Sequence, residues 1–278
     1  MEVNLMNNST CNISGLIAKA SILLAAFNVQ TAFAESNEEL AKKLSNPIAS
    51  LISVPFQLNY DSDIGPSDSG ERYQLNIQPV IPISLTDDWN IISRTILPVV
   101  SQEDTFSGAG SQSGLGDVVQ SFFFSPKQPT ESGWIWGAGP VLLLPTATDD
   151  LLGSDKWGLG PTAVVLKQNG PWTYGALANH IWSVVGDDDR QDISTTFLQP
   201  FLSYTTKEAV TFGLNTESAY DWKSEQWAVP INFTATKVMK FGNQIVSIGA
   251  GVRYWAESTD GGPEGLGARL LFTLLFPK

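Results

Sequence analysis

The sequence predicts an all-β fold, a single twelve-stranded antiparallel transmembrane β-barrel of the outer-membrane type. Three observations predict it: apolar and polar residues alternate with a period of two, short turns alternate with long loops, and the tryptophans gather near strand ends. A period of two places successive side chains on opposite faces of a strand, so each strand has one apolar and one polar face.

The composition excludes several classes of protein. The 278 residues carry 16 Lys+Arg against 28 Asp+Glu, a net charge of −12, which argues against a nucleic-acid partner because phosphate contacts need clustered basic residues. One Cys and one His exclude a disulfide scaffold and a Cys/His zinc site. No apolar run reaches the roughly 20 residues of a membrane-spanning helix. A membrane protein of this composition has to cross with strands.

Residues 1–34 have the layout of a secretory signal peptide. Lys19 precedes a short apolar stretch at residues 21–29, and small residues follow at Ala32 and Ala34. We expect cleavage after Ala34. An N-terminal anchor helix is the alternative, and the apolar stretch is too short for it.

Residues 35–50 are expected to form a periplasmic lead-in to the barrel. The run ESNEELAKKLSN fits a short amphipathic helix in which Glu39 and Lys43 stand four residues apart and support each other across one turn. We expect this segment to be solvated.

Residues 51–278 contain the alternating segments. The first shows the pattern clearly, with Ile52 and Val54 set against Ser53 and Gln57. Turn signals place twelve strands at 51–60, 71–83, 89–100, 115–125, 133–145, 157–168, 172–185, 193–206, 208–221, 226–238, 244–256 and 266–277.

The connections between these strands fall into two classes. Those after the second, sixth, eighth and tenth strands are tight, whereas those after the first, third, fifth and eleventh are long and rich in Gly, Ser and Asp. Outer-membrane barrels have this asymmetry, with short turns and both chain ends on the periplasmic side.

The tryptophans distinguish a barrel from a soluble β-sandwich, whose strands also alternate. In a sandwich the apolar faces meet in a core, so Trp falls mid-strand as often as at strand ends. Here each Trp lies within a few residues of a predicted strand end: Trp89, Trp134, Trp136, Trp157, Trp172, Trp182, Trp222, Trp227 and Trp255. Indole rings at these positions form an aromatic girdle at the level of the lipid headgroups.

Eight prolines fall inside the predicted strands, at positions 55, 79, 82, 98, 140, 161, 200 and 230. Each removes one hydrogen bond from the strand ladder, and a closed barrel has no free edge that would tolerate the loss. Bulges or lumenal water are expected to satisfy the carbonyls left without a partner.

Several stretches resemble one family of bacterial outer-membrane barrels: NPIASLISVPFQLNY (46–60), GLGDVVQSFFFSP (114–126), LLPTATDDLLGSDKWGLGP (143–161), NHIWSVVGDDDR (179–190) and GVRYWAE (251–257), with the closing LLFPK (274–278). Its members are named as transporters of the phenol meta-cleavage pathway, and some carry the name neuromedin U by a naming accident. The resemblance covers nearly all of the mature chain and implies passage of small aromatic compounds. Many such barrels end in an aromatic residue, whereas here Pro277 and Lys278 follow the last aromatic residue. Recognition by the barrel-insertion machinery would therefore use Phe276.

Charged residues on the polar faces of the strands are candidates for the pore lining, because twelve strands enclose a wider lumen than eight. They are Arg72, Arg94, Asp117, Glu217, Asp221, Arg253, Glu257 and Arg269. Such residues set the selectivity of a channel. Alternatively, they pair across the lumen, brace the barrel and block it.

His180 suggests a third interpretation, a lipid hydrolase with a serine and a histidine on the barrel surface. Ser183 lies three positions away on the same strand and therefore points to the opposite face, and no G-x-S-x-G motif is present. The run Asp187, Asp188 and Asp189 lacks the spaced ligands and the glycine of a calcium loop. We expect neither catalysis nor metal binding from these residues.

The expected function is a passive channel for small molecules in the outer membrane of a Gram-negative bacterium, with hydrophobic or aromatic compounds as candidate permeants. It is passive because the sequence has no Gly-rich phosphate-binding loop with its Lys; no cofactor is expected. Its partners would be outer-membrane lipids, the barrel-insertion machinery and the permeant. The alternative is a structural or adhesion barrel with a blocked lumen.

Overall fold

A computed structural model of the chain describes residues 35–277. The predicted signal peptide lies outside these residues. The elements in chain order are α2 (Asn37–Leu44), β1 (Ile52–Ile64), β2 (Gly70–Ile77), β3 (Val80–Ser84), β4 (Trp89–Glu103), β5 (Ser111–Leu115), β6 (Val118–Pro126), β7 (Trp134–Leu144), β8 (Lys156–Asn169), β9 (Trp172–Gly186), β10 (Ser194–Thr205), β11 (Val210–Thr216), β12 (Ser218–Asp221), β13 (Gln226–Phe241), β14 (Gln244–Glu257) and β15 (Leu266–Phe276). No helix in this part of the chain is long and apolar enough to cross a membrane.

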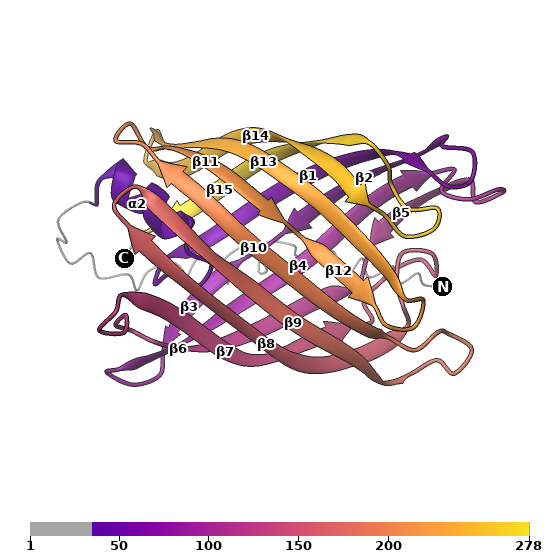
Figure 1. Cartoon of the computed structure of the whole chain (residues 1–278), viewed down its shortest axis with the longest axis horizontal. Helices are drawn as coiled ribbons and strands as arrows, with labels where there is room; N and C mark the ends of the chain where they lie inside the picture. The colour runs from indigo at the N-terminus through magenta and orange to yellow at the C-terminus, as the bar shows by residue number, and fades with distance from the viewer. Residues whose placement is uncertain (1–34, 278) are drawn as a thin grey trace, which may run out of the picture. The chain divides into compact units, whose positions relative to one another are not determined.

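The strands form one closed antiparallel sheet (Figure 1). Their order is β11-β10-β12-β13-β14-β15-β1-β2-β4-β6-β7-β8-β9, and β9 pairs with β10, which closes the barrel. Three strands are interrupted, so that β2 and β3, β5 and β6, and β11 and β12 are each two parts of one strand. The predicted fold, a twelve-stranded antiparallel barrel, is confirmed.

Each of the three interruptions lies at or opposite a proline: Pro55 and Pro79 at the break between β2 and β3, Pro98 at that between β5 and β6, and Pro230 at that between β11 and β12. Because proline has no N–H, the facing carbonyl loses its ladder partner. The proline carbonyls still accept: the amides of Gln78, Gly116 and Glu217 donate to Pro55, Pro98 and Pro230 at 2.8, 2.9 and 3.4 Å. Pro140 and Pro161 face each other, so two missing donors coincide at one point of the ladder.

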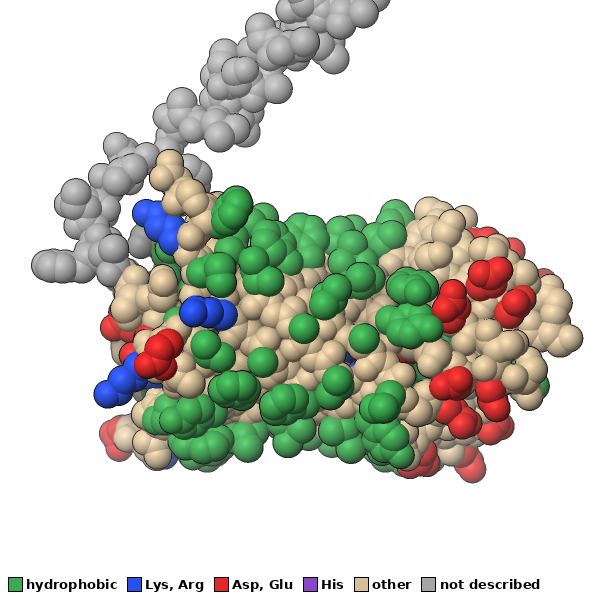
Figure 2. Space-filling view, turned by 90° about the horizontal axis from the view of Figure 1, so that it is seen from above, with side chains coloured by type: hydrophobic (Ala, Val, Ile, Leu, Met, Phe, Trp, Pro, Cys, Tyr) green, Lys and Arg blue, Asp and Glu red, His purple; other side chains and the backbone are tan. Residues whose placement is uncertain are grey.

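The outer surface of the barrel carries an apolar belt (Figure 2). Strand β8 shows how the sequence pattern produces it, because Trp157, Leu159 and Val165 are exposed on the outer face whereas Val164 and Leu166 face inward and are buried. Acidic side chains gather at the end of the barrel that carries the long loops (Figure 2).

Eight of the nine tryptophans lie on the outer face in two groups. Trp89, Trp134, Trp136 and Trp172 are at the short-turn end, and Trp157, Trp182, Trp222 and Trp227 are at the long-loop end. The expectation was wrong for Trp255. Its position on β14 has the same parity as that of the buried Arg253, so its ring points into the lumen and its Nε1 donates to Asp61 at 2.8 Å.

Helix α2 packs into the short-turn end of the barrel. Its residues Leu40 and Ala41 are buried together with Val238 of β13 and Leu275 of β15, whose side chains face the lumen. The lumenal side chain of Gln168 also donates to the carbonyl of Lys42 at 2.8 Å. The helix therefore narrows the lumen at this end.

The structure corrects the expectation of a solvated lead-in segment. Glu39 does not pair with Lys43; it accepts from the amide of Ser36, while the Ser36 side chain accepts from the amide of Glu39, a reciprocal cap of the helix start. The pair at i,i+4 spacing is Glu38 with Lys42, at 2.7 Å. The helix therefore keeps the charged pair Glu38 and Lys42 partly exposed and buries its apolar face in the barrel.

Candidate functional site: the barrel lumen

The side chains that face the lumen form two different walls. Strands β4 and β6 to β9 contribute an apolar wall that includes Ile92, Phe123, Val164, Leu166 and Leu177, all buried. Ile48, which follows α2, packs against this wall. The opposite wall, from β1, β2 and β12 to β15, is polar and holds most of the lumenal charge.

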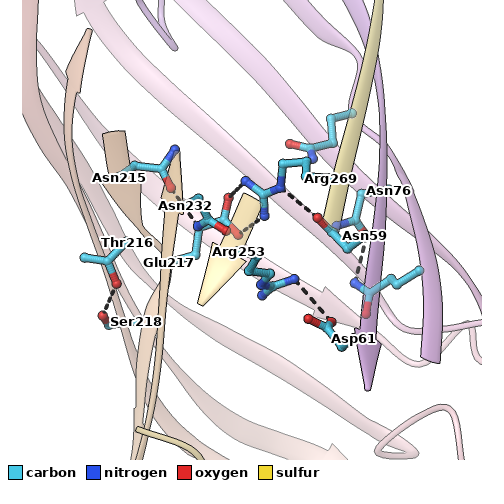
Figure 3. Close-up of polar contacts among 12 residues, drawn as sticks. Asn59, Asp61, Asn76, Asn215, Thr216, Glu217, Ser218, Asn232, Arg253 and Arg269 are labelled. Carbon is cyan, nitrogen blue, oxygen red and sulfur yellow. Dashed lines mark hydrogen bonds and ion pairs between the residues drawn. The ribbon is translucent and has the colours of Figure 1, made fainter. Parts of the chain in front are cut away.

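The centre of the polar wall is an ion pair between Arg269 and Glu217 (Figure 3). The two terminal nitrogens of Arg269 donate to the two carboxylate oxygens of Glu217 at 3.0 and 2.7 Å, and its Nε donates to Asn59 Oδ1 at 2.7 Å. Arg269 is only 2% exposed. Two parallel charge-assisted hydrogen bonds fix both the distance and the plane of the pair.

A second ion pair joins Arg253 and Asp61 (Figure 3). Arg253 Nη1 lies 3.4 Å from Asp61 Oδ2, while the other oxygen of Asp61 accepts from the indole of Trp255. The guanidinium of Arg253 also lies over the Trp255 ring, 4.6 Å from its centroid. Arg253 Nε is buried without a hydrogen-bond partner among the described residues.

Arg72 and Arg94 are the other two lumenal arginines. Among residues 35–277, neither has a carboxylate oxygen within 4.0 Å of its guanidinium. Arg94 donates to the side-chain oxygen of Gln78 at 3.1 Å, and Arg72 Nε is buried without a partner in the described part of the chain.

The remaining candidates for the pore lining lie toward the long-loop end. Asp117 anchors a loop: its oxygens accept from the amides of Thr146 and Ala147, both at 3.2 Å, and from the amide and hydroxyl of Ser154. Asp221 accepts from the amide of Lys223 and the hydroxyl of Ser224. Glu257 is exposed at the end of β14. None of the three lies in the group formed by the four arginines.

Two cavities border the polar wall. The inner one, of about 270 Å³, lies between α2 and the wall and is lined by Arg94, Gln78, Gln57, Phe201 and Leu271 among others. The outer one, of about 380 Å³, is lined by Arg72, Phe106, Leu151 and Trp255 among others. Each cavity thus combines an arginine with apolar surface.

His180 lies on the outer face of β9, not in the lumen. Its ring packs at a tilt of 47° against that of Trp182, with 4.1 Å between the centroids, and its Nδ1 lies 2.7 Å from the hydroxyl of Thr196. Ser183, as expected, is not its partner, because the Ser183 hydroxyl donates to Asp192 at 3.1 Å.

No family model and no curated protein matches the sequence. Among solved structures, an outer membrane channel from Pseudomonas putida F1 superposes with a TM-score of 0.65 at 16% identity, over 82% of this chain and 96% of that chain. The chain has an outer-membrane β-barrel fold. The barrel also resembles the NanC porin (TM-score 0.49, 11% identity, 82% and 100% coverage) and outer membrane phospholipase A from Escherichia coli (TM-score 0.48, 9% identity, 81% and 90% coverage). At these identities the likeness concerns the fold alone.

Sequence reasoning missed two lumenal residues of this barrel, Asp61 and Trp255, and placed Asn59 on the polar face of its strand without naming it as a candidate. Their parity could have identified them, because Asn59 and Asp61 continue the inward series of Ser53 and Gln57 on β1.

Proposed function

We propose that this protein is a passive channel for small molecules in the outer membrane of a Gram-negative bacterium. It would reach that membrane after cleavage near Ala34, with the short turns facing the periplasm. The observation that carries the proposal is a lumen with cavities of about 270 and 380 Å³ separated by a layer of ion pairs. An eight-stranded barrel fills its interior with side chains, whereas this wider barrel keeps space that a small molecule can enter.

The two lumenal walls support hydrophobic or aromatic compounds as the permeants. Water hydrates an apolar wall poorly, whereas an aromatic ring gains dispersion contacts with it and buries apolar surface against it. The family resemblance of the sequence points to the same class of compound. Outer-membrane lipids and the barrel-insertion machinery are proposed as its other partners.

The first test is conductance. Purified mature protein, reconstituted into planar bilayers, is expected to give reproducible single-channel steps. Folding is checked on the same sample by the altered gel mobility of an unheated barrel. A folded barrel that stays electrically silent would contradict the proposal and favour a structural or adhesion role.

The second test concerns α2 as a constriction. Leu40→Asp places a charge in the fully buried site beside Val238 and Leu275, which opposes docking of the helix by about 2–5 kcal/mol. We expect larger conductance steps from this variant. Glu38→Gln is the matched control, because it removes only a partly exposed ion pair on the same helix. Equal step sizes in both variants would show that α2 does not limit the current.

A further inference from the structure

The middle of the lumen has an excess of positive charge. Four arginines, Arg72, Arg94, Arg253 and Arg269, face two carboxylates, those of Asp61 and Glu217. Both carboxylates are already bound at short range, Asp61 by Arg253 and Glu217 by Arg269. They also act at longer range on the other two arginines, but two negative charges cannot neutralise four positive ones.

The excess charge sits at the two cavities. Arg94 lines the inner cavity and has a neutral amide, Gln78, as its hydrogen-bond partner. Arg72 lines the outer cavity, where its buried Nε has no partner among the described residues. Asp260, the carboxylate at the rim of the outer cavity, accepts from Gln226 at 2.7 Å. A guanidinium on each side of the layer of ion pairs is therefore free to bind an anion.

The rest of each cavity suits an apolar group. In the inner cavity, Phe201, Leu271 and Leu44 lie around Arg94 together with uncharged amides such as Gln57. An inorganic anion would gain nothing from the apolar side chains, and a neutral hydrocarbon would leave the guanidinium without a counter-charge. A compound with a carboxylate at one end and an apolar body at the other uses both.

We propose that the lumen binds small amphipathic carboxylates, compounds of the size of benzoate, with the carboxylate on Arg94 in the inner cavity and on Arg72 in the outer one. This inference rests on the proposed channel function and names its permeant. The acidic loops at the long-loop end do not prevent entry of such anions, because exposed charges are screened within about 8 Å at physiological ionic strength. The lumenal arginines are screened far less.

The test combines selectivity and block in planar bilayers. In a salt gradient the wild-type current is expected to be anion-selective, and benzoate is expected to interrupt it. Benzyl alcohol lacks the charge, whereas acetate and inorganic phosphate lack the apolar body. We expect each of them to block at least about tenfold more weakly than benzoate. Equal block by benzyl alcohol or phosphate, or a cation-selective current, would overturn the inference.

Variants locate the site. Arg94→Gln is expected to weaken benzoate block about tenfold or more, whereas Arg94→Lys keeps the charge and is expected to keep the anion selectivity. Lys223→Gln, at an exposed loop position, is the control that also removes one positive charge. If Lys223→Gln and Arg94→Gln reduce the anion selectivity equally, the selectivity depends on net charge alone, and the carboxylate site at Arg94 is refuted.

Calorimetry separates this inference from the proposed function. Benzoate is titrated into the detergent-solubilised wild type and Arg94→Gln, which requires no conductance. Loss of the inner-cavity binding in Arg94→Gln, with the binding at Arg72 retained, supports the carboxylate sites even in a silent barrel. A conducting barrel that binds no benzoate overturns the site and leaves the channel standing.

Discussion

Replacing Arg269 by methionine is expected to destabilise the folded barrel by about 3–5 kcal/mol, because it removes the bidentate partner of a largely buried carboxylate and leaves the hydrogen bonds of that carboxylate unmade. The Arg269 side chain is 2% exposed and that of Glu217 is 20% exposed, and two hydrogen bonds join them at 3.0 and 2.7 Å. Arg269 also donates to Asn59, so a second polar group loses its partner. The free energy of unfolding is measured by urea titration in lipid vesicles, followed by tryptophan fluorescence.

A double-mutant cycle tests whether the cost comes from the pair. Glu217→Gln combined with Arg269→Met removes both charges, and we expect it to recover a large part of the loss, since no carboxylate is then left without its bidentate partner. Arg190→Met is the matched control: its loop ion pair with Asp155, at 3.5 Å, is partly exposed and is expected to contribute about 1 kcal/mol or less. If the double variant loses as much stability as Glu217→Gln and Arg269→Met lose together when measured singly, Arg269 and Glu217 do not act as a pair.

The fold could be predicted from sequence because its determinants are local. The alternation at Ile52 to Gln57, the tight turns and the girdle tryptophans each depend on residues a few positions apart. Trp255 shows the limit of using strand ends alone. Nearness to an end placed it in the girdle, whereas parity with Arg253 places it in the lumen. Seven of the eight prolines lie inside strands as predicted, whereas Pro79 lies in the break between β2 and β3. The role of the prolines as strand breaks depends on which residue faces them on the next strand.

The lumenal site could be predicted only in part, because its pairs are set by register and closure. Parity puts Arg269 and Glu217 on inward faces, but they are 52 residues apart and meet only once the barrel has closed. Asp117 has a polar-face position in the sequence, yet the break between β5 and β6 turns its carboxylate toward the loop at residues 146–154. The alternation of apolar and polar residues predicts neither the pairing of Arg269 with Glu217 nor the orientation of Asp117.

An arginine in place of Phe233 is expected to have the second large effect, a loss of about 2–4 kcal/mol, the cost of a cation on the lipid face near the bilayer midplane. Phe233 lies at the middle of β13, is 49% exposed, and stands between Leu214 and Val252 on the neighbouring strands, both also exposed and apolar. This surface belongs to the apolar belt, so hydrocarbon is its expected surroundings. The measurement is again urea unfolding in lipid vesicles.

The neighbouring residue supplies a control at the same depth and on the other face. Thr234 lines the inner cavity, and its strand neighbours Gly213 and Gly251 leave room for a longer side chain. Thr234→Arg is therefore expected to cost much less than Phe233→Arg, although it adds the same charge to the same strand. If both substitutions cost the same, the outer face of β13 does not contact hydrocarbon, and the assignment of inner and outer faces is wrong.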